Sequence, residues 1–174
     1  TVRVDADAAY PATMSGALTR DGGSVGGLIK NGPGTLILSG DNTYDGPTTV
    51  NGGTLLVNGS HTGGGAYSVS GSGILGGSGT VNASGFVVSS DSAISPGTSV
   101  GTLALTTDLS FANGGELITE LDSLLSYDIL AVTGTVDFAP GSVLTVIDNY
   151  GSSVGDSYEI LTATGGVTGW AGIL

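Results

Sequence analysis

The chain has 174 residues, of which 39% are hydrophobic, 33 are glycine and none is cysteine. This length and apolar content can form one well-packed core, and so much glycine with few helix-forming residues favours strands and tight turns. The 15 acidic and 3 basic residues give a formal net charge of −12, which makes nucleic acid and anionic membranes poor partners. Without cysteine, disulfides, thiolate zinc sites and cysteine nucleophiles are excluded.

Short strands separated by turns are predicted at the start of the chain. Residues 2–4 alternate apolar and polar side chains, residues 12–18 do so more weakly, and Asp21-Gly22-Gly23 is a turn signal. No basic-then-apolar signal segment precedes them, and no apolar run approaches the roughly 18 residues of a membrane-spanning helix. We therefore expect targeting or anchoring segments to lie outside this sequence.

Residues 28–57 contain one phrase twice. The segment Gly34–Gly40 (Gly-Thr-Leu-Ile-Leu-Ser-Gly) returns as Gly53–Gly59 (Gly-Thr-Leu-Leu-Val-Asn-Gly), so that Thr54 repeats Thr35. A strand phrase bounded by glycine and repeated at about 20 residues is typical of a solenoid. Because side chains alternate along a strand, one set of apolar residues is expected to point into the core. This set is Leu36, Leu38, Leu55 and Val57.

Four further short apolar segments follow the repeat. They are residues 67–69, 74–75, 80–81 and 86–88, separated by glycine and serine. The intervals are too short for crossover helices between parallel strands. An all-β fold, a parallel β-helix, is therefore the expected architecture, in which each turn of the chain pairs with the turn before it.

The predicted strands become longer from Ala93 onward. They cover residues 101–105, 116–121, 127–132, 142–147 and 158–162, with turns at Asn113-Gly114-Gly115 and Pro140-Gly141. We interpret residues 93–174 as a C-terminal cap, partly antiparallel and continuous with the rungs of residues 1–92. The residues expected in its core or packed faces are Ile129, Leu130, Val132, Leu144, Val146, Ile160 and Leu161.

A helix is the alternative interpretation of one segment in this cap. Leu117, Leu121, Leu124 and Leu125 stand at i, i+4, i+7 and i+8, which is a helical stripe. The β-branched pair Ile118-Thr119 favours a strand instead.

The repeat resembles the autotransporter-associated β-strand repeat of bacterial passenger domains. The matching positions are Leu28, Lys30, Gly32, Gly34, Thr35, Leu36, Leu38, Ser39, Gly40, Asn42, Thr43, Tyr44, Gly46, Thr48, Val50, Gly53 and Leu55. The C-terminal part is similar to the autochaperone, or junction, region of such passengers. Its matching positions are Pro96, Gly97, Ser99, Gly101, Thr102, Leu103, Leu121, Asp128, Ile129, Leu130, Val132, Gly134 and residues 158–161.

This resemblance implies that the parallel β-helix is right-handed. It also implies a stem that folds outside the cell after type V secretion and acts as a template for rungs that arrive later. The implied partners are its own translocator barrel and the upstream passenger rungs, with a host-cell or self-association partner reached through the upstream region. Trp170 stands where phenylalanine is commoner, and the sequence stops at Leu174 without the last strand, linker helix and barrel. We therefore expect it to be a piece of a longer protein.

The candidate chemical motifs are incomplete. Gly155-Asp156-Ser157 resembles serine hydrolase signatures, but a serine nucleophile needs an adjacent base, and the single histidine, His61, is interpreted as a solvated turn residue. The segment Asp41–Gly46 partly follows a calcium loop, yet Gly52 replaces the bidentate glutamate. Carboxylate pairs such as Asp5/Asp7 and Glu120/Asp122 are interpreted as solvated outer faces.

The sequence therefore predicts a structural stem of an autotransporter passenger at the bacterial cell surface. We expect no catalytic, cofactor or metal site, no small-molecule substrate and no nucleic acid. An adhesin fragment that binds a host or neighbouring cell through the β-helix face is the alternative. A β-helical enzyme acting on carbohydrate is a third hypothesis, and no residue set supports it.

Overall fold

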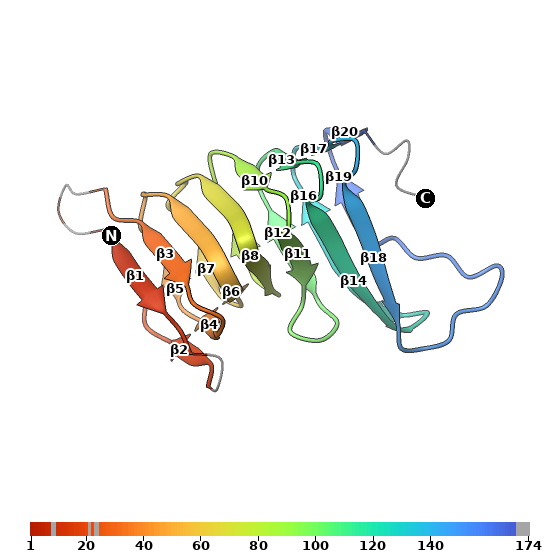
Figure 1. Cartoon of the computed structure of the whole chain (residues 1–174), viewed down its shortest axis with the longest axis horizontal. Helices are drawn as coiled ribbons and strands as arrows, with labels where there is room; N and C mark the ends of the chain where they lie inside the picture. Colours follow the sequence, from red (N-terminus) through yellow and green to blue (C-terminus); the bar gives the residue numbers. More distant parts are fainter. Residues whose placement is uncertain (8–9, 21, 23–24, 170–174) are drawn as a thin grey trace.

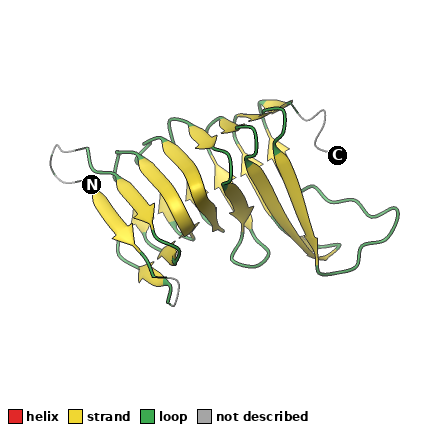
Figure 2. Cartoon of the chain, in the orientation of Figure 1, coloured by secondary structure: helices red, strands yellow, loops and turns green. Residues whose placement is uncertain are grey.

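The computed structural model describes residues 1–7, 10–20, 22 and 25–169, so Trp170 lies outside the described residues. Within them the chain is all β, with no helix, and its strands form a parallel β-solenoid of about 6 turns (Figures 1 and 2). Successive turns lie side by side along one long axis, with the N-terminus near one end (Figure 1). The predicted parallel β-helix is confirmed.

The strands form three columns, each of which runs along the solenoid. Face A consists of β1 (Val2–Asp5), β3 (Leu28–Asn31), the first parts of β6 (Thr48–Val57) and β8 (Tyr67–Gly77), β10 (Phe86–Val88), β13 (Leu109–Phe111), β17 (Thr135–Phe138) and β20 (Gly166–Thr168). Face B consists of β2 (Ala12–Met14), β4 (Thr35–Leu38), the second parts of β6 and β8, β11 (Ala93–Pro96), β14 (Glu116–Ser123) and β18 (Val143–Asp148). Face C consists of β5 (Asp41–Asn42), β7 (Ser60–His61), β9 (Thr80–Val81), β12 (Thr102–Leu105), β16 (Ile129–Val132) and β19 (Leu161–Ala163).

The strand register follows the sequence period. Leu36 pairs with Leu55, and these two leucines hold the same place in the two copies of the repeated phrase. The turns lengthen toward the C-terminus, where Leu103 pairs with Leu130 and Leu130 pairs with Leu161, partners that are further apart in the sequence. The extra residues form loops that project from the stack. The cross-section of the stack itself stays the same.

Paired strands place equivalent side chains on top of one another inside the solenoid. On face B this column runs through Leu36, Leu55, Leu75, Ile94 and Leu117, all fully buried. Each such side chain contributes about 2 kcal/mol through removal of apolar surface from water. The core is therefore a set of parallel columns, and each side chain packs mainly against its counterparts one turn away.

Glycine lets the chain bend sharply where faces A and B meet. Gly53 has a φ of 61°, in the left-handed region, and lies within β6 between its face A and face B parts. A Cβ at this position would also collide with the carbonyl oxygen of Gly34 in the turn below. Both the backbone angle and the close approach of the turns therefore require glycine here.

The expected core residues occupy different depths. Leu36, Leu38, Leu55, Val57, Leu130 and Val132 are buried, whereas Ile129, Leu144, Ile160 and Leu161 are half-buried. Val146 is 46% exposed, and its placement in a packed cap was wrong. It pairs with the buried Thr119 and so belongs to the inward column, but among the described strands β14 is the only one paired with β18. No described turn covers it.

Antiparallel pairing in the cap is local. β14 and β15 (Ser126–Tyr127) form an antiparallel hairpin, and the remaining strand pairs of the described cap are parallel. The helical alternative for this segment is wrong, because Leu117 and Leu121 point inward from a strand. Leu125, which is 95% exposed, lies in the hairpin turn.

Substitution of Leu130 should destabilise the chain far more than substitution of Leu18. Leu130 is fully buried between β12 and β19, whereas Leu18 is half-buried near the N-terminal end. We expect Leu130→Asp to lower the free energy of unfolding by about 3 kcal/mol or more, because it buries an unpaired charge and leaves a cavity. Leu18→Asp should cost less than half as much in a denaturant titration. Equal midpoints would contradict this prediction.

Candidate functional site

The 28–57 repeat differs from the rest of the core because polar side chains lie inside it. Lys30, Asn42 and Thr48 are fully buried. Lys30 shares the inward side of β3 with Leu28, since side chains alternate along the strand. In the next turn Lys30 stacks on Val50, so a charged group and a valine occupy one column.

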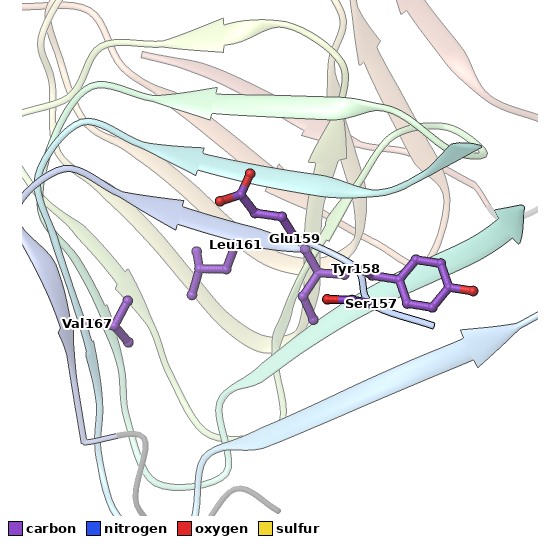
Figure 3. Close-up of a pocket in the computed structure, with 6 residues that line it drawn as sticks. Ser157, Tyr158, Glu159, Leu161 and Val167 are labelled. Atoms are coloured by element: carbon purple, nitrogen blue, oxygen red, sulfur yellow. The ribbon is translucent and has the colours of Figure 1, made fainter. Parts of the chain in front are cut away.

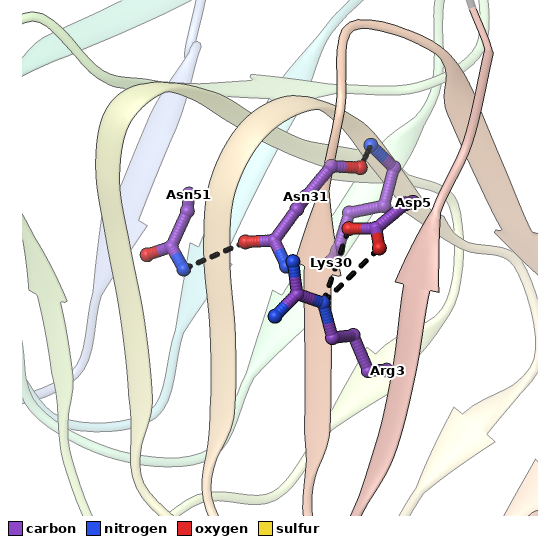
Figure 4. A network of polar contacts seen from close by, with 5 residues as sticks. All are labelled: Arg3, Asp5, Lys30, Asn31 and Asn51. Atoms are coloured by element: carbon purple, nitrogen blue, oxygen red, sulfur yellow. Dashed lines mark hydrogen bonds and ion pairs between the residues drawn. The ribbon is translucent and has the colours of Figure 1, made fainter.

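The ammonium group of Lys30 is held by backbone carbonyl oxygens alone. Its Nζ donates to the carbonyl oxygen of Asn31 at 2.8 Å (Figure 4) and to those of Gly32 and Gly52, both at 2.9 Å. These three bonds use all three donors of the ammonium group. Burial lowers the pKa of Lys30, and the carboxylate of Asp5 opposes this effect. Lys30 therefore ties the corner of its own turn to the corner of the next.

A second set of polar contacts runs along the outside of the same corner. The amide of Asn51 donates to Oδ1 of Asn31 at 2.9 Å (Figure 4), and Ser70 donates to Oδ1 of Asn51 at 3.0 Å. Arg3 donates to Asp5 one turn earlier (Figure 4). Hydrogen bonds from Arg3 and Asn31 lower the pKa of the Asp5 carboxyl. The ladder fixes the register of four successive turns from the solvent side.

Asn42 hydrogen-bonds the backbone groups of a third corner. Its Oδ1 accepts from the amide of Leu18 at 2.9 Å, and its Nδ2 donates to the carbonyl oxygens of Gly40 at 2.9 Å and Ser60 at 3.2 Å. One side chain thus connects the turn before it and the turn after it. Asn42 is a structural residue at the corner where β5 is only two residues long.

His61 is buried, and its interpretation as a solvated turn residue was wrong. It lies on β7, where it pairs with Asn42 before it and Val81 after it. One ring nitrogen contacts the carbonyl oxygen of Tyr44 and the other the hydroxyl of Tyr67, each at 2.7 Å. The imidazole also stacks on Tyr44, with 4.0 Å between ring centroids. The repeat period places His61 in a column of inward-pointing side chains. Its glycine-rich local sequence gave no indication of this position.

Asp128 forms a comparable clamp in the C-terminal turns. Its fully buried carboxylate accepts from the amides of Gly101 and Glu120, both at 2.9 Å. Burial raises the pKa of Asp128 to about 6, although both amide hydrogen bonds favour the ionised form. The clamp joins the loop before β12 to the β14–β15 hairpin.

The possible serine nucleophile is not paired with the histidine. Ser157 lies in the segment between β18 and β19, and it lines a hollow of about 540 Å³ together with Tyr158, Glu159 and Val167 (Figure 3). His61 cannot serve as that base, because both of its ring nitrogens already have partners in the core. The strand predicted over residues 158–162 is present as β19, but it begins only at Leu161.

The acidic motifs form local contacts. Asp41 accepts from the hydroxyl of Ser60 at 2.8 Å, and Asp45 pairs with Arg20 at 2.8 Å. Asp122 accepts from Asn149 at 3.0 Å. Over the described part of the chain, no group of three histidine, cysteine or acidic side chains is placed to hold a metal ion.

Both ends of the described solenoid present open strand edges. β1 and β2 each pair with one strand only, as do β18, β19 and β20. At the C-terminal end, Val146 and Val167 from the last turn are 46% and 41% exposed. These ends combine unpaired backbone groups with apolar side chains, which are the two features that another turn requires.

The comparisons agree with this geometry. The family model of the passenger-associated-transport-repeat matches residues 28–57. Residues 28–57 are therefore similar to this repeat, and we call them the passenger repeat. The match confirms the resemblance to autotransporter passengers, in which this passenger repeat is typical, and it implies a secreted, surface-exposed protein. A search of curated proteins found no match to the chain. The described residues contain no helix that is long and apolar enough to cross a membrane.

Lys30→Met should test the inner corner of the passenger repeat. Methionine fills a similar space but leaves the carbonyl oxygens of Asn31, Gly32 and Gly52 without the ammonium donor, so we expect a loss of about 2 kcal/mol or more in denaturant unfolding. The matched control is Ile29→Met on the same strand, which changes a half-buried side chain on the opposite side. Wild-type stability in Lys30→Met would show that the desolvation cost of the charge cancels its hydrogen bonds.

Proposed function

We propose that this chain is a non-catalytic stem of an autotransporter passenger, which templates the folding of neighbouring turns during secretion and displays the region upstream of it. The observation that carries the proposal is the pair of open strand edges on a solenoid that contains a passenger repeat. An edge of this kind presents its amide and carbonyl groups in the register that the next turn needs.

The physical basis of templating is that a single turn cannot fold alone. A two-residue strand such as β5 or β7 has too few hydrogen bonds and too little apolar surface to offset the conformational entropy of ordering it. Added to an existing turn, the same residues gain backbone pairing and a side-chain column at once. Stability then grows by nearest-neighbour steps along the stack.

We propose that the C-terminal turns fold first. The longest described strand pair on face B outside the repeat region is β14 with β18, and the Asp128 clamp connects this part of face B to face C. The resemblance of residues 93–174 to an autochaperone region supports the same order. Residues 1–92 would then add turn by turn in the direction of the N-terminus.

The proposed partners follow from this role. The chain would pass through the periplasm and the outer membrane by way of its own translocator barrel, and it would remain at the cell surface beneath the upstream passenger turns. Catalysis is not part of the proposal, because Ser157 is not paired with the histidine and the acidic side chains are engaged in local contacts.

Pulse-labelling hydrogen exchange during refolding tests the order of folding. The C-terminal probes are the amides of Thr133 and Ala139, which donate to Leu105 and Phe111. The N-terminal probes are the amides of Ser39 and Thr43, which donate to Met14 and Leu18. We expect the C-terminal amides to become protected first and to show the highest protection at equilibrium. Earlier or stronger protection of the Ser39 and Thr43 amides would overturn the proposal.

A further inference from the structure

His61 joins three successive corners of the solenoid through side chains that lie inside it. Tyr44 follows β5, Tyr67 begins β8, and the histidine ring lies between them on β7. Tyr67 stacks in turn on Phe86, with 4.7 Å between ring centroids. From this geometry we infer that the neutral imidazole of His61 holds the passenger repeat against the turn that follows it, and that protonation of the ring in acid weakens this contact.

The hydrogen bonds fix the tautomer of the imidazole. The carbonyl oxygen of Tyr44 can only accept, so Nε2 of His61, 2.7 Å away, must carry its hydrogen. In the neutral ring Nδ1 is then an acceptor, and the hydroxyl of Tyr67 donates to it at 2.7 Å. Both nitrogens are satisfied in this one arrangement, which requires a neutral ring.

Protonation breaks the arrangement at Nδ1. A second N–H would point at the hydroxyl of Tyr67, which would have to redirect its own hydrogen to another acceptor. The nearby hydroxyls of Tyr44 and Thr48 already share a hydrogen bond of 2.7 Å. Each of these oxygens can still accept a hydrogen bond, so the imidazolium ion would force the hydroxyls of Tyr44, Thr48 and Tyr67 to reorient together and would place a charge inside the core.

The surroundings of the ring offer no compensating negative charge among the recorded contacts. The titratable groups that face it are the phenols of Tyr44 and Tyr67, and burial raises the pKa of both. Its strand partners Asn42 on β5 and Val81 on β9 are uncharged. Asp45, next to Tyr44 in the chain, is paired with Arg20. A charged imidazole here would be buried without a counter-ion.

The sign of the effect follows from linkage. Burial lowers the pKa of His61 below its usual value of 6.5, and the Tyr44 carbonyl opposes this only in part. The unfolded chain therefore binds the proton first, so the contribution of His61 to stability is complete above about pH 6.5 and is lost as the pH falls. Asp128, with its pKa raised to about 6, acts in the opposite direction, because the folded chain then binds the proton first.

Because His61 is the single histidine of the chain, nitrogen NMR reports on it without assignment ambiguity. We expect the Nε2–H tautomer at pH 7.5 and a titration midpoint below 6.5 in the intact chain. The amides of Thr48 and Thr62 donate to Ala66 and Asn42, and their protection factors should fall severalfold between pH 7 and pH 5. Those of Thr133 and Ala139 should change less.

His61→Gln is the matched variant. Its carboxamide can donate to the Tyr44 carbonyl and accept from Tyr67, but it does not titrate, so the acid-induced loss of protection at Thr48 and Thr62 should disappear. A midpoint at or above 6.5, the Nδ1–H tautomer, or an unchanged loss of protection in His61→Gln would each overturn the inference. Should the variant not fold, the tautomer and midpoint of the wild-type chain decide the question. The inference does not depend on the order of folding proposed above.

Discussion

Backbone pairing between consecutive turns is the constraint on which this structure depends. Many of the strands are only two to four residues long, and each finds its hydrogen-bond partners only in the turns on either side. Once the backbone is paired in this way, side chains at equivalent positions of successive turns must lie on top of one another. The glycine corners, the leucine columns and the outer asparagine ladder all follow from keeping one cross-section from turn to turn.

The passenger repeat shows why a solenoid contains polar residues inside. Apolar columns favour stacking but allow turns to slide by two residues without exposing a hydrophobic side. Lys30, Asn42 and His61 bond to particular carbonyl, amide and hydroxyl groups of adjacent corners, and these partners exist in one register only. Asp128 has the same role in the longer turns. Apolar columns supply stability, and the buried polar groups select the register.

Period and alternation were enough to predict the parallel solenoid and to separate inward from outward side chains in residues 28–57. These two sequence signals failed where the local composition did not indicate whether a residue lies in a column of buried, inward-pointing side chains. His61 stands among glycines, yet the register of the repeat pairs it with Asn42 and so places it in the core. Val146 has the right alternation, but burial depends on a covering turn that no local pattern reveals. The beginning of β19 at Leu161 depends on a tertiary partner, Leu130, which belongs to the preceding turn.

Removal of one complete turn tests most directly the claim that this chain is held together by nearest-neighbour stacking. Deletion of residues 67–85 brings Phe86 into the register position of Tyr67 and joins strands that keep their columns. The account predicts a folded, cooperative protein with unchanged β content per residue and a denaturant m-value reduced in proportion to its length. Deletion of residues 67–76, half a turn, should abolish the cooperative transition. Unfolding of the whole-turn variant, or equal behaviour of the two, would contradict the account.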